Sequence, residues 1–222
     1  MDEIYAIIPV SKFKNAKTRL SPFLNELERE ELLKAMLKDV TDVLKENVDK
    51  IILISSDDDV LSYGNDLNLL TLKENETSNL NKALTQSMEY CNSKVKKVII
   101  TPSDIPLIGK IDFKNLIEIS KSNEMTISPS KGGGTNILII EPNSFTTDFG
   151  EFSYLKHLKL AKENNLKYFV YDSFFAALDV NTTEDLGEIM VHGVETKTKE
   201  YLEELNISVE SIHGKERLKV RR

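Results

Sequence analysis

Four cations gather near the amino terminus, in the segment "KFKNAKTRLSP" at residues 12–22. They are Lys12, Lys14, Lys17 and Arg19, and no acid occurs between residues 4 and 25. A loop of this composition repels itself unless an anion lies among the cations. Arginine can bind phosphate through two hydrogen bonds, and lysine supplies a mobile point charge. The segment therefore predicts a phosphate site, with a solvated loop of chance composition as the alternative.

Two separated aspartates have the chemistry of metal ligands. Asp104 lies in "TPSDIPLI" (101–108), where prolines on both sides stiffen the chain after a buried strand. Asp179 lies in "LDVNTTEDL" (178–186), where we expect a strand to end. Mg²⁺ takes hard oxygen ligands and keeps waters and substrate phosphates in its shell. A turn cap is the alternative for Asp104. Asn181 or Thr182 is expected to cap the next helix, with Asp185 completing a capping box, which leaves Asp179 unexplained.

Two further segments have backbone groups suited to an anion. Three glycines in "SPSKGGGTN" (128–136) let the main chain approach a ligand and turn its N–H groups toward it. A hairpin connection is the alternative, and the spacing fits neither a P-loop nor a dinucleotide-binding fingerprint. In "DFGEFSYLKH" (148–157), Gly150 and Ser153 flank an expected helix start, whose free N–H groups favour a carboxylate or phosphate. His157 follows about one turn later, where an isolated histidine is more often structural than catalytic.

The segments that must position these residues alternate between strand-like and helix-like patterns. Short apolar runs predict strands, and apolar residues at helical spacing predict helices. The expected strands are 4–10, 50–56, 67–72, 96–102, 125–130, 135–141 and 166–171. The expected helices are 24–46, 58–65, 79–92 with Ser78 as its cap, 112–122, 152–165, 183–191 and 195–205.

This alternation predicts an α/β fold with a mixed, mostly parallel sheet sandwiched by helices. The strand 135–141 should be antiparallel to its predecessor, because "KGGG" is too short for a helical crossover. Open sheets of this kind bind ligands at the carboxyl ends of their strands. The loops described above are expected at that edge.

Composition excludes several classes of protein. The 222 residues carry a net charge of −7 and 40% hydrophobic residues, which fits one folded domain rather than a disordered chain. A pI near 5.2 argues against nucleic acid as a partner, and no apolar run is long enough for a membrane span. A single cysteine, Cys91, and an amino terminus unlike a signal peptide fit the cytoplasm. The basic tail "GKERLKVRR" is expected to be a solvated end.

Five segments together resemble a known family. In order, "IIPVSKFKNAKTRLSP", "IITPSDIPLI", "SPSKGGGTN", "FGEFSYLKH" and "LDVNTTEDL" are similar to archaeal 2-phospho-L-lactate guanylyltransferases, over about residues 4–190. The resemblance implies a nucleotidyltransferase fold of the glycosyltransferase-A type. It implies transfer of GMP from GTP to 2-phospho-L-lactate with Mg²⁺ as cofactor, in biosynthesis of coenzyme F-420. We expect one domain over 1–222, with 192–222 a helical and basic extension, and a homodimer.

The resemblance also implies roles for individual residues. Lys17 and Arg19 would hold the triphosphate as catalytic residues, with Lys12 nearby to bind substrate. Asp104 and Asp179 match metal-binding aspartates, and Asp104 is also expected to be catalytic. Thr135, Gly150 and Ser153 match positions that bind the small phosphorylated acid. Gly133, Gly134 and Asn136 are also expected to bind substrate.

The sequence departs from the pattern of this fold at two points. Relatives often have an Asp-x-Asp pair, whereas Pro102 and Ser103 precede Asp104, and a second aspartate is frequent where Asn181 stands. Chemistry with one metal ion is therefore favoured over chemistry with two. Phosphoenolpyruvate, a sugar phosphate or a pterin cofactor are alternative acceptors, and a non-catalytic nucleotide-binding protein is the alternative from another class.

Overall fold

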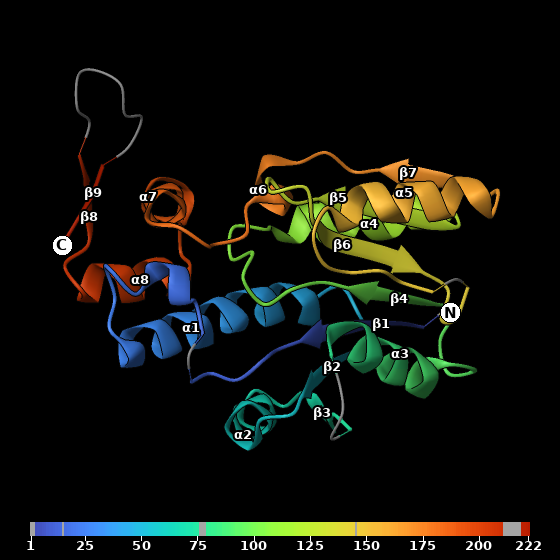
Figure 1. Ribbon diagram of the computed structural model, residues 1–222, viewed down its shortest axis with the longest axis horizontal. Helices are drawn as coiled ribbons and strands as arrows, with labels where there is room; N and C mark the ends of the chain where they lie inside the picture. Colours follow the sequence, from blue (N-terminus) through green and yellow to red (C-terminus); the bar gives the residue numbers. More distant parts are fainter. Residues whose placement is uncertain (1–2, 15, 76–78, 145, 211–218) are drawn as a thin grey trace.

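Seven strands form the central sheet of the computed structural model, which describes residues 3–14, 16–75, 79–144, 146–210 and 219–222. The strands are β1 (Ile4–Pro9), β2 (Lys50–Ser55), β3 (Leu70–Lys73), β4 (Lys97–Ile100), β5 (Met125–Pro129), β6 (Thr135–Ile140) and β7 (Tyr168–Val170). Their order across the sheet is β3-β2-β1-β4-β6-β5-β7 (Figure 1). Strand β6 is antiparallel to β4 and β5, and the other pairs are parallel. The mixed, mostly parallel sheet and its antiparallel strand are confirmed.

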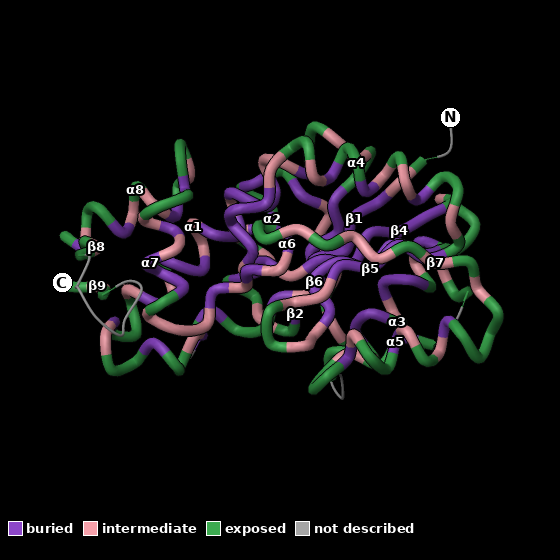
Figure 2. The backbone as a smooth tube through the Cα atoms, turned by 90° about the horizontal axis from the view of Figure 1, so that it is seen from above, coloured by how far each residue is buried: buried purple, intermediate pink, exposed green. Residues whose placement is uncertain are grey.

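Helices cover both faces of the sheet because its inner strands are apolar on both sides. In β1, Ile7 and Ile8 belong to the two different core clusters, and both side chains are fully buried. The helices on the face of Ile8 are α1 (Glu26–Lys45), α2 (Asp58–Asp66) and α4 (Lys110–Ser120), and those on the face of Ile7 are α3 (Leu80–Cys91) and α5 (Ser153–Glu163). Buried backbone accordingly follows the strands through the middle of the molecule (Figure 2).

Two boundaries differ from their predictions for local reasons. The strand expected at 67–72 begins only at Leu70, because Asn68 adopts a left-handed conformation (φ 56°) after α2. Helix α3 is capped by Asn79, whose side chain accepts a hydrogen bond from a backbone N–H of the first turn (3.1 Å). The predicted cap, Ser78, lies outside the described residues.

Helices α7 (Thr183–His192) and α8 (Lys197–Glu204) pack with strands β8 (Ser208–Glu210) and β9 (Lys219–Arg221) at one end of the molecule, where α8 lies against α1 (Figure 1). The short helix α6 (Phe174–Ala177) instead contacts β5 and β6. Asp39 of α1 accepts hydrogen bonds from the backbone N–H groups of Lys197 (2.7 Å) and Thr198 (2.9 Å), which begin α8. The part of the chain expected to be a helical extension thus contains α8 and also a pair of antiparallel strands, β8 and β9.

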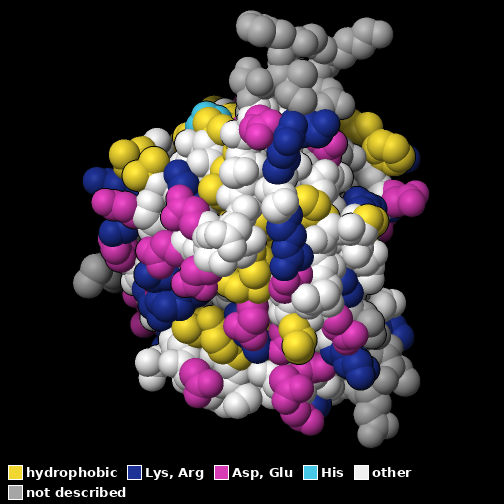
Figure 3. All heavy atoms as spheres, turned by 90° about the vertical axis from the view of Figure 1, so that its left-hand side faces the viewer, with side chains coloured by type: hydrophobic (Ala, Val, Ile, Leu, Met, Phe, Trp, Pro, Cys, Tyr) yellow, Lys and Arg dark blue, Asp and Glu magenta, His cyan; other side chains and the backbone are white. Residues whose placement is uncertain are grey.

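The end of the chain is attached to the domain at residues 219–222, although Lys219, Arg221 and Arg222 are exposed, as expected of a solvated end. Strand β9 pairs with β8, and the guanidinium of Arg222 forms an ion pair with Glu28 of α1. The remainder of "GKERLKVRR" lies outside the described residues. Acidic and basic side chains are interspersed over this end of the molecule (Figure 3). None of the helices in the described ranges is long and apolar enough to cross a bilayer.

Candidate active site

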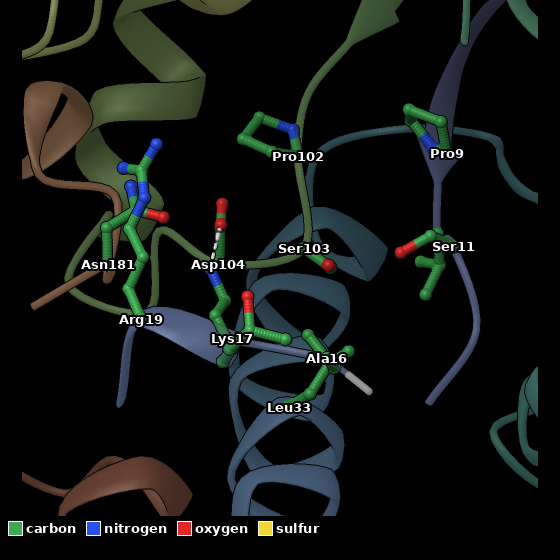
Figure 4. A pocket seen from close by; sticks show the side chains of 12 residues that line it. Pro9, Ser11, Ala16, Lys17, Arg19, Leu33, Pro102, Ser103, Asp104 and Asn181 are labelled. Carbon is green, nitrogen blue, oxygen red and sulfur yellow. Dashed lines mark hydrogen bonds and ion pairs between the residues drawn. The ribbon is translucent and has the colours of Figure 1, made fainter. Parts of the chain in front are cut away.

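A cavity of about 360 Å³ opens where the chain leaves the carboxyl ends of β1 and β4 (Figure 4). This is the edge of a parallel sheet at which α/β proteins bind ligands. Its polar lining includes Ser11, Lys17, Arg19, Ser103, Asp104 and Asn181. Three of the predicted site residues, Lys17, Arg19 and Asp104, therefore share one cavity, whereas Ser11 and Ser103 were not predicted.

The loop after β1 is held in shape by a buried arginine of α1. Arg29 donates from Nε to the carbonyl oxygen of Ala16 (3.0 Å) and from Nη1 to that of Leu24 (2.8 Å). Between these two attachments Lys17 adopts a left-handed conformation, with φ 50°, and begins a short 3-10 helix over Thr18–Leu20. Such a conformation costs a non-glycine residue about 1–2 kcal/mol, so the attachments must impose it. Arg29 thereby fixes the direction in which Lys17 points.

Lys17 joins the two segments that carry the aspartates. Its Nζ forms an ion pair with Asp104 and donates a hydrogen bond to the carbonyl oxygen of Val180 (2.6 Å). The backbone N–H of Val180 in turn donates to the carbonyl oxygen of Asp104 (2.9 Å). The side chains of Lys17 and Asp104 are 10% and 19% exposed, so their attraction is only partly screened by water. Figure 4 shows this ion pair at the centre of the cavity wall.

Asp179 lies near Asp104, and one oxygen of each carboxylate lacks a hydrogen-bond partner among the described residues. The Oδ1 atoms of Asp104 and Asp179 are buried and have no hydrogen-bond partner among the described residues. Burial raises the pKa of Asp179, and the negative charge of Asp104 raises it further. Because unpaired buried carboxylate oxygens are costly, the pair fits a bound hard cation. No group of three or more His, Cys, Asp or Glu side chains in the described part of the chain could hold a metal, so other oxygens would complete its shell.

The four cations of the first loop do not act as one cluster. Lys17 and Arg19 line the cavity, with Arg19 beside Asn181 in Figure 4. Lys12 and Lys14 are exposed and are not part of the cavity lining. The charge count predicted a phosphate site in this loop, and two of its four cations do line the cavity. It could not predict which side chains turn inward.

A short helix, α6, precedes Asp179, so the prediction that a strand end presents this residue is wrong. Asn136 of β6 donates from Nδ2 to the carbonyl oxygen of Ala176 (2.8 Å). The backbone N–H of Lys131 donates to the carbonyl oxygen of Ala177 (2.9 Å). These contacts hold α6 against the loop between β5 and β6. Its four residues are too few to produce a helical period in the sequence.

Asp185 links the same loop to the segment around Asp179. Its Oδ2 accepts hydrogen bonds from the backbone N–H groups of Asn181 and Thr182 (both 2.8 Å), which confirms the predicted helix cap. Its Oδ1 forms an ion pair with Lys131, and the Asp185 side chain is 1% exposed. The sequence indicated only a helix cap at this position. No sequence signal connected it with Lys131.

The glycine loop between β5 and β6 requires glycine at a specific position. Gly133 has φ 81°, and a Cβ added there would lie 3.2 Å from Cδ1 of Phe152. The backbone N–H of Gly134 donates to Oγ of Ser130 (2.9 Å), which closes the turn. Gly150 has φ 139° and open space around it. The loop is therefore a tight connection, as the alternative prediction held, and it also lies against the residue preceding α5.

Thr135, Ser153 and His157 form a buried cluster behind this loop. Oγ of Ser153 lies 3.3 Å from Oγ1 of Thr135, which lies 2.9 Å from Nδ1 of His157. Burial lowers the pKa of His157 to about 4, so the ring is neutral at physiological pH. These residues do not line the cavity described above. The structure thus divides the predicted site residues into two groups, which are connected through α6 and Asp185.

Comparison with solved structures shows which known proteins share this fold. A protein from Desulfovibrio desulfuricans described as a nucleotide-diphospho-sugar transferase superposes with a TM-score of 0.79 at 16% identity, covering 93% of this chain and 96% of its own. Rv0371c from Mycobacterium tuberculosis, solved with manganese, superposes with a TM-score of 0.54 at 12% identity, covering 85% and 98%. At these identities the likeness concerns the fold, and the predicted fold class is confirmed.

Comparison of the sequence identifies the family. Residues 4–222 match the family described as guanylyl transferase, CofC-like. The 2-phospho-L-lactate guanylyltransferase of Methanobrevibacter smithii is 64% identical over 222 residues, covering 100% of this chain and 99% of that protein. The chain belongs to this guanylyl transferase family, which confirms the resemblance found in its motifs.

Proposed function

We propose that the protein transfers GMP from GTP to 2-phospho-L-lactate, giving lactyl-2-diphospho-5′-guanosine and pyrophosphate for coenzyme F-420 biosynthesis. Family membership over residues 4–222 supports this reaction. The observation that carries it in the structure is the cavity at the ends of β1 and β4, where Lys17 and Arg19 accompany Asp104. Cations beside carboxylates are what a triphosphate with a bound metal ion requires.

The reaction joins two anions, so their mutual repulsion is the main obstacle. A phosphate oxygen of the acceptor attacks the α-phosphorus of GTP, and the bond to the pyrophosphate leaving group breaks as the new P–O bond forms. An ionised phosphate is already nucleophilic, so no side chain needs to remove a proton from it. Lys17 and Arg19 neutralise charge on the triphosphate. Their contribution is positioning and electrostatic stabilisation.

Asp104 and Asp179 are the residues that would hold Mg²⁺. Their buried Oδ1 atoms lack partners among the described residues, and the raised pKa of Asp179 reflects a carboxylate that needs positive charge nearby. When bound, Mg²⁺ supplies charge that offsets the negative phosphate oxygens. Lys17 now contacts Asp104. We propose that Lys17 exchanges this partner for the triphosphate when the substrates bind.

The acceptor would lie against the glycine loop and the start of α5. Thr135 and Ser153 offer hydroxyl groups there, and Gly150 leaves open space beside the helix start. Gly133 and Gly134 shape the loop that borders the same place.

Two other predicted substrate-binding residues have different surroundings. The Asn136 amide donates to α6, so we assign Asn136 to positioning that helix. Lys12 is exposed outside the cavity lining, and its contact with substrate stays a prediction. Its flexible side chain and position in the cation loop support an outer phosphate contact.

Release of pyrophosphate from GTP tests the proposed function directly. With Mg²⁺, the protein should release pyrophosphate when 2-phospho-L-lactate is added, and lactate without its phosphate should be inactive. Phosphoenolpyruvate and a sugar phosphate in parallel reactions identify the acceptor. GTP binding in a calorimeter without pyrophosphate release on any acceptor would indicate a non-catalytic binding protein and refute the proposal.

We also propose a homodimer in the cytoplasm. Large apolar side chains at α6, in the last turn of α7 and just after it support a contact surface, since Phe174, Val191 and Val194 are 54%, 48% and 74% exposed. The only cysteine, Cys91, is buried and free, which suits a reducing compartment. Light scattering on the purified protein tests the dimer, and a monomer at micromolar concentration would contradict it.

A further inference from the structure

We propose that His157 is a positioning residue for the acceptor, whose imidazole arranges the hydroxyl groups of Thr135 and Ser153 so that one hydroxyl proton is presented to a negatively charged oxygen of the substrate. The inference rests on the proposed function, which places the phosphorylated acid at these hydroxyls. His157 acts through them and does not touch the substrate. It adds to the site a residue that the sequence marked as structural.

The backbone around residue 148 determines where the imidazole carries its proton. The N–H of Asp148 points at Nε2 of His157, with 3.1 Å between the nitrogens. A backbone N–H can only donate, so Nε2 must accept and carries no proton. A neutral imidazole has one N–H, which must then be at Nδ1. Nδ1 therefore donates to Oγ1 of Thr135, 2.9 Å away.

The cluster of His157, Thr135 and Ser153 has one more proton than it has contacts between its members. His157 Nδ1, Thr135 Oγ1 and Ser153 Oγ carry one proton each, and the three groups make two contacts with one another. Whichever hydroxyl donates in the contact between Thr135 and Ser153, one hydroxyl proton is left over. Within the described part of the chain it has no acceptor. The exposed fractions of Thr135 and Ser153 are 9% and 2%, so water alone is a poor partner for it.

The opposite tautomer would turn the cluster from a hydrogen-bond donor into an acceptor. With the proton on Nε2, Thr135 would donate to Nδ1 and Ser153 to Thr135, so the cluster would present only lone pairs. Lone pairs repel a phosphate or carboxylate, whereas a hydroxyl proton binds it through a charge-assisted hydrogen bond. The tautomer of His157 therefore decides whether this place accepts an anion.

The surrounding elements hold the cluster in this state. The ring of Phe149 packs edge-on against the imidazole of His157, with centroids 4.8 Å apart. Asn81 of α3 binds the backbone of Phe149 on both sides, accepting from its N–H (2.8 Å) and donating to its carbonyl oxygen (3.0 Å). This attachment keeps the neighbouring N–H of residue 148 directed at the ring. Ser153 is also the first residue of α5, whose dipole favours negative charge at that end.

Nuclear magnetic resonance of the protein without substrates tests the tautomer independently of activity. Long-range ¹H–¹⁵N spectra of histidine-labelled protein distinguish a protonated Nδ1 from a protonated Nε2, and the spectrum of His157→Gln assigns the signal. We expect the Nδ1–H tautomer, unchanged between about pH 6 and pH 8 because the pKa lies near 4. An Nε2–H tautomer would overturn the proposal, even in a fully active enzyme.

Two substitutions then separate positioning from simple packing. The amide of His157→Asn can place a donor near the former Nδ1, whereas that of His157→Gln reaches the position of Nε2 and cannot donate to Thr135. For His157→Gln we expect the KM for 2-phospho-L-lactate to rise about tenfold or more, with the KM for GTP changed less than about twofold. His157→Asn should recover most of the acceptor KM. His192→Gln, at an exposed histidine, is the matched control.

The KM values and the spectrum distinguish a positioning role of His157 from a structural one. Equal changes in both KM values, without recovery by His157→Asn, would show a structural role and overturn the inference. An unchanged acceptor KM in His157→Gln would do the same. Absence of pyrophosphate release by the unaltered protein would refute the proposed function instead, while the spectrum would still decide how the hydroxyl groups are oriented.

Discussion

The two groups of site residues differ in charge. At the ends of β1 and β4, opposite charges lie in contact, with Lys17 paired to Asp104 and Asp179 beside them. At the glycine loop and the start of α5, the polar groups are neutral: backbone N–H groups, two hydroxyls and an uncharged imidazole. In the proposed function the first group exchanges partners when the substrates bind, whereas the hydrogen bonds of the second group are already formed. A triphosphate with its metal needs compensating charge, and a small acid needs shape and a few directed donors.

This comparison predicts that the charged group responds mainly to loss of charge and the neutral group mainly to loss of geometry. Substituting Asp104 by Asn should have the largest effect, because it removes a negative charge that pairs with Lys17 and that the proposed metal ion would require. We expect pyrophosphate release to fall by about 10³-fold, since electrostatic contacts at the reacting centre contribute on this scale. A steady-state assay measures the loss, and circular dichroism checks the fold. Asp58→Asn, at an exposed residue of α2, should retain activity; retention in Asp104→Asn as well would remove Asp104 from the mechanism.

In the cation loop, Lys17 lines the cavity and Lys14 does not, so their substitution should have different effects. Lys17→Met keeps the length of the side chain but removes the charge, and it leaves Asp104 without its partner. We expect the kcat/KM for GTP to fall by about 10²-fold, the size of the loss of one partly buried charge contact to a phosphate. Lys14→Met, in the same loop but outside the cavity lining, should change it less than about twofold. Equal losses in the two variants would show that the loop acts through its total charge rather than through Lys17.

Parts of the site could be predicted from sequence because they depend on local patterns. Asp104 follows a buried strand, and the cations follow another, so sheet topology alone brings them to one edge. The family resemblance singled out Lys17, but composition and periodicity could not show that its side chain turns inward, because the loop is shaped by hydrogen bonds from Arg29 to its main chain. Helix α6 was missed for the same reason, because a contact distant in sequence, that of Asn136 with Ala176, holds it. The pairing of β8 with β9 is local in sequence, but strands of three residues are too short to produce a recognisable pattern.

In the neutral group, His157 should make the free energy of unfolding depend on pH. Burial lowers the pKa of His157 from 6.5 to about 4; the charge of Asp148 opposes this change to a smaller extent, and the charge of Lys156 adds slightly to it. Below pH 6.5 the unfolded chain takes up a proton that the folded protein refuses until about pH 4. The stabilisation by neutral His157 is therefore complete above pH 6.5 and is lost as the pH falls toward 4, by about 3 kcal/mol in total.

Urea unfolding of the unaltered protein and of His157→Gln at about pH 7 and pH 4.5 measures this effect. The difference in free energy of unfolding between the two proteins should shrink at the lower pH. The raised pKa values of Asp39 and Asp179 act in the opposite direction, but they are common to both proteins and cancel in the difference. A difference that does not change with pH would show that His157 is not held neutral by the fold.

The smallest predicted effect tests whether the glycine loop is arranged in advance. Gly133→Ala forces an L-residue to φ 81° and places its Cβ 3.2 Å from the ring of Phe152, whereas at Gly132 a Cβ would meet only Oγ of Ser130 at 3.8 Å. The left-handed conformation should cost Gly133→Ala about 1–2 kcal/mol of unfolding free energy, and Gly132→Ala should stay within about 0.5 kcal/mol. Because Phe152 immediately precedes Ser153, relaxation of the strain should also raise the KM for the acceptor and not that for GTP. If both variants bind the acceptor like the unaltered protein, the loop does not define that half of the site, and shape there must come from the hydroxyl cluster alone.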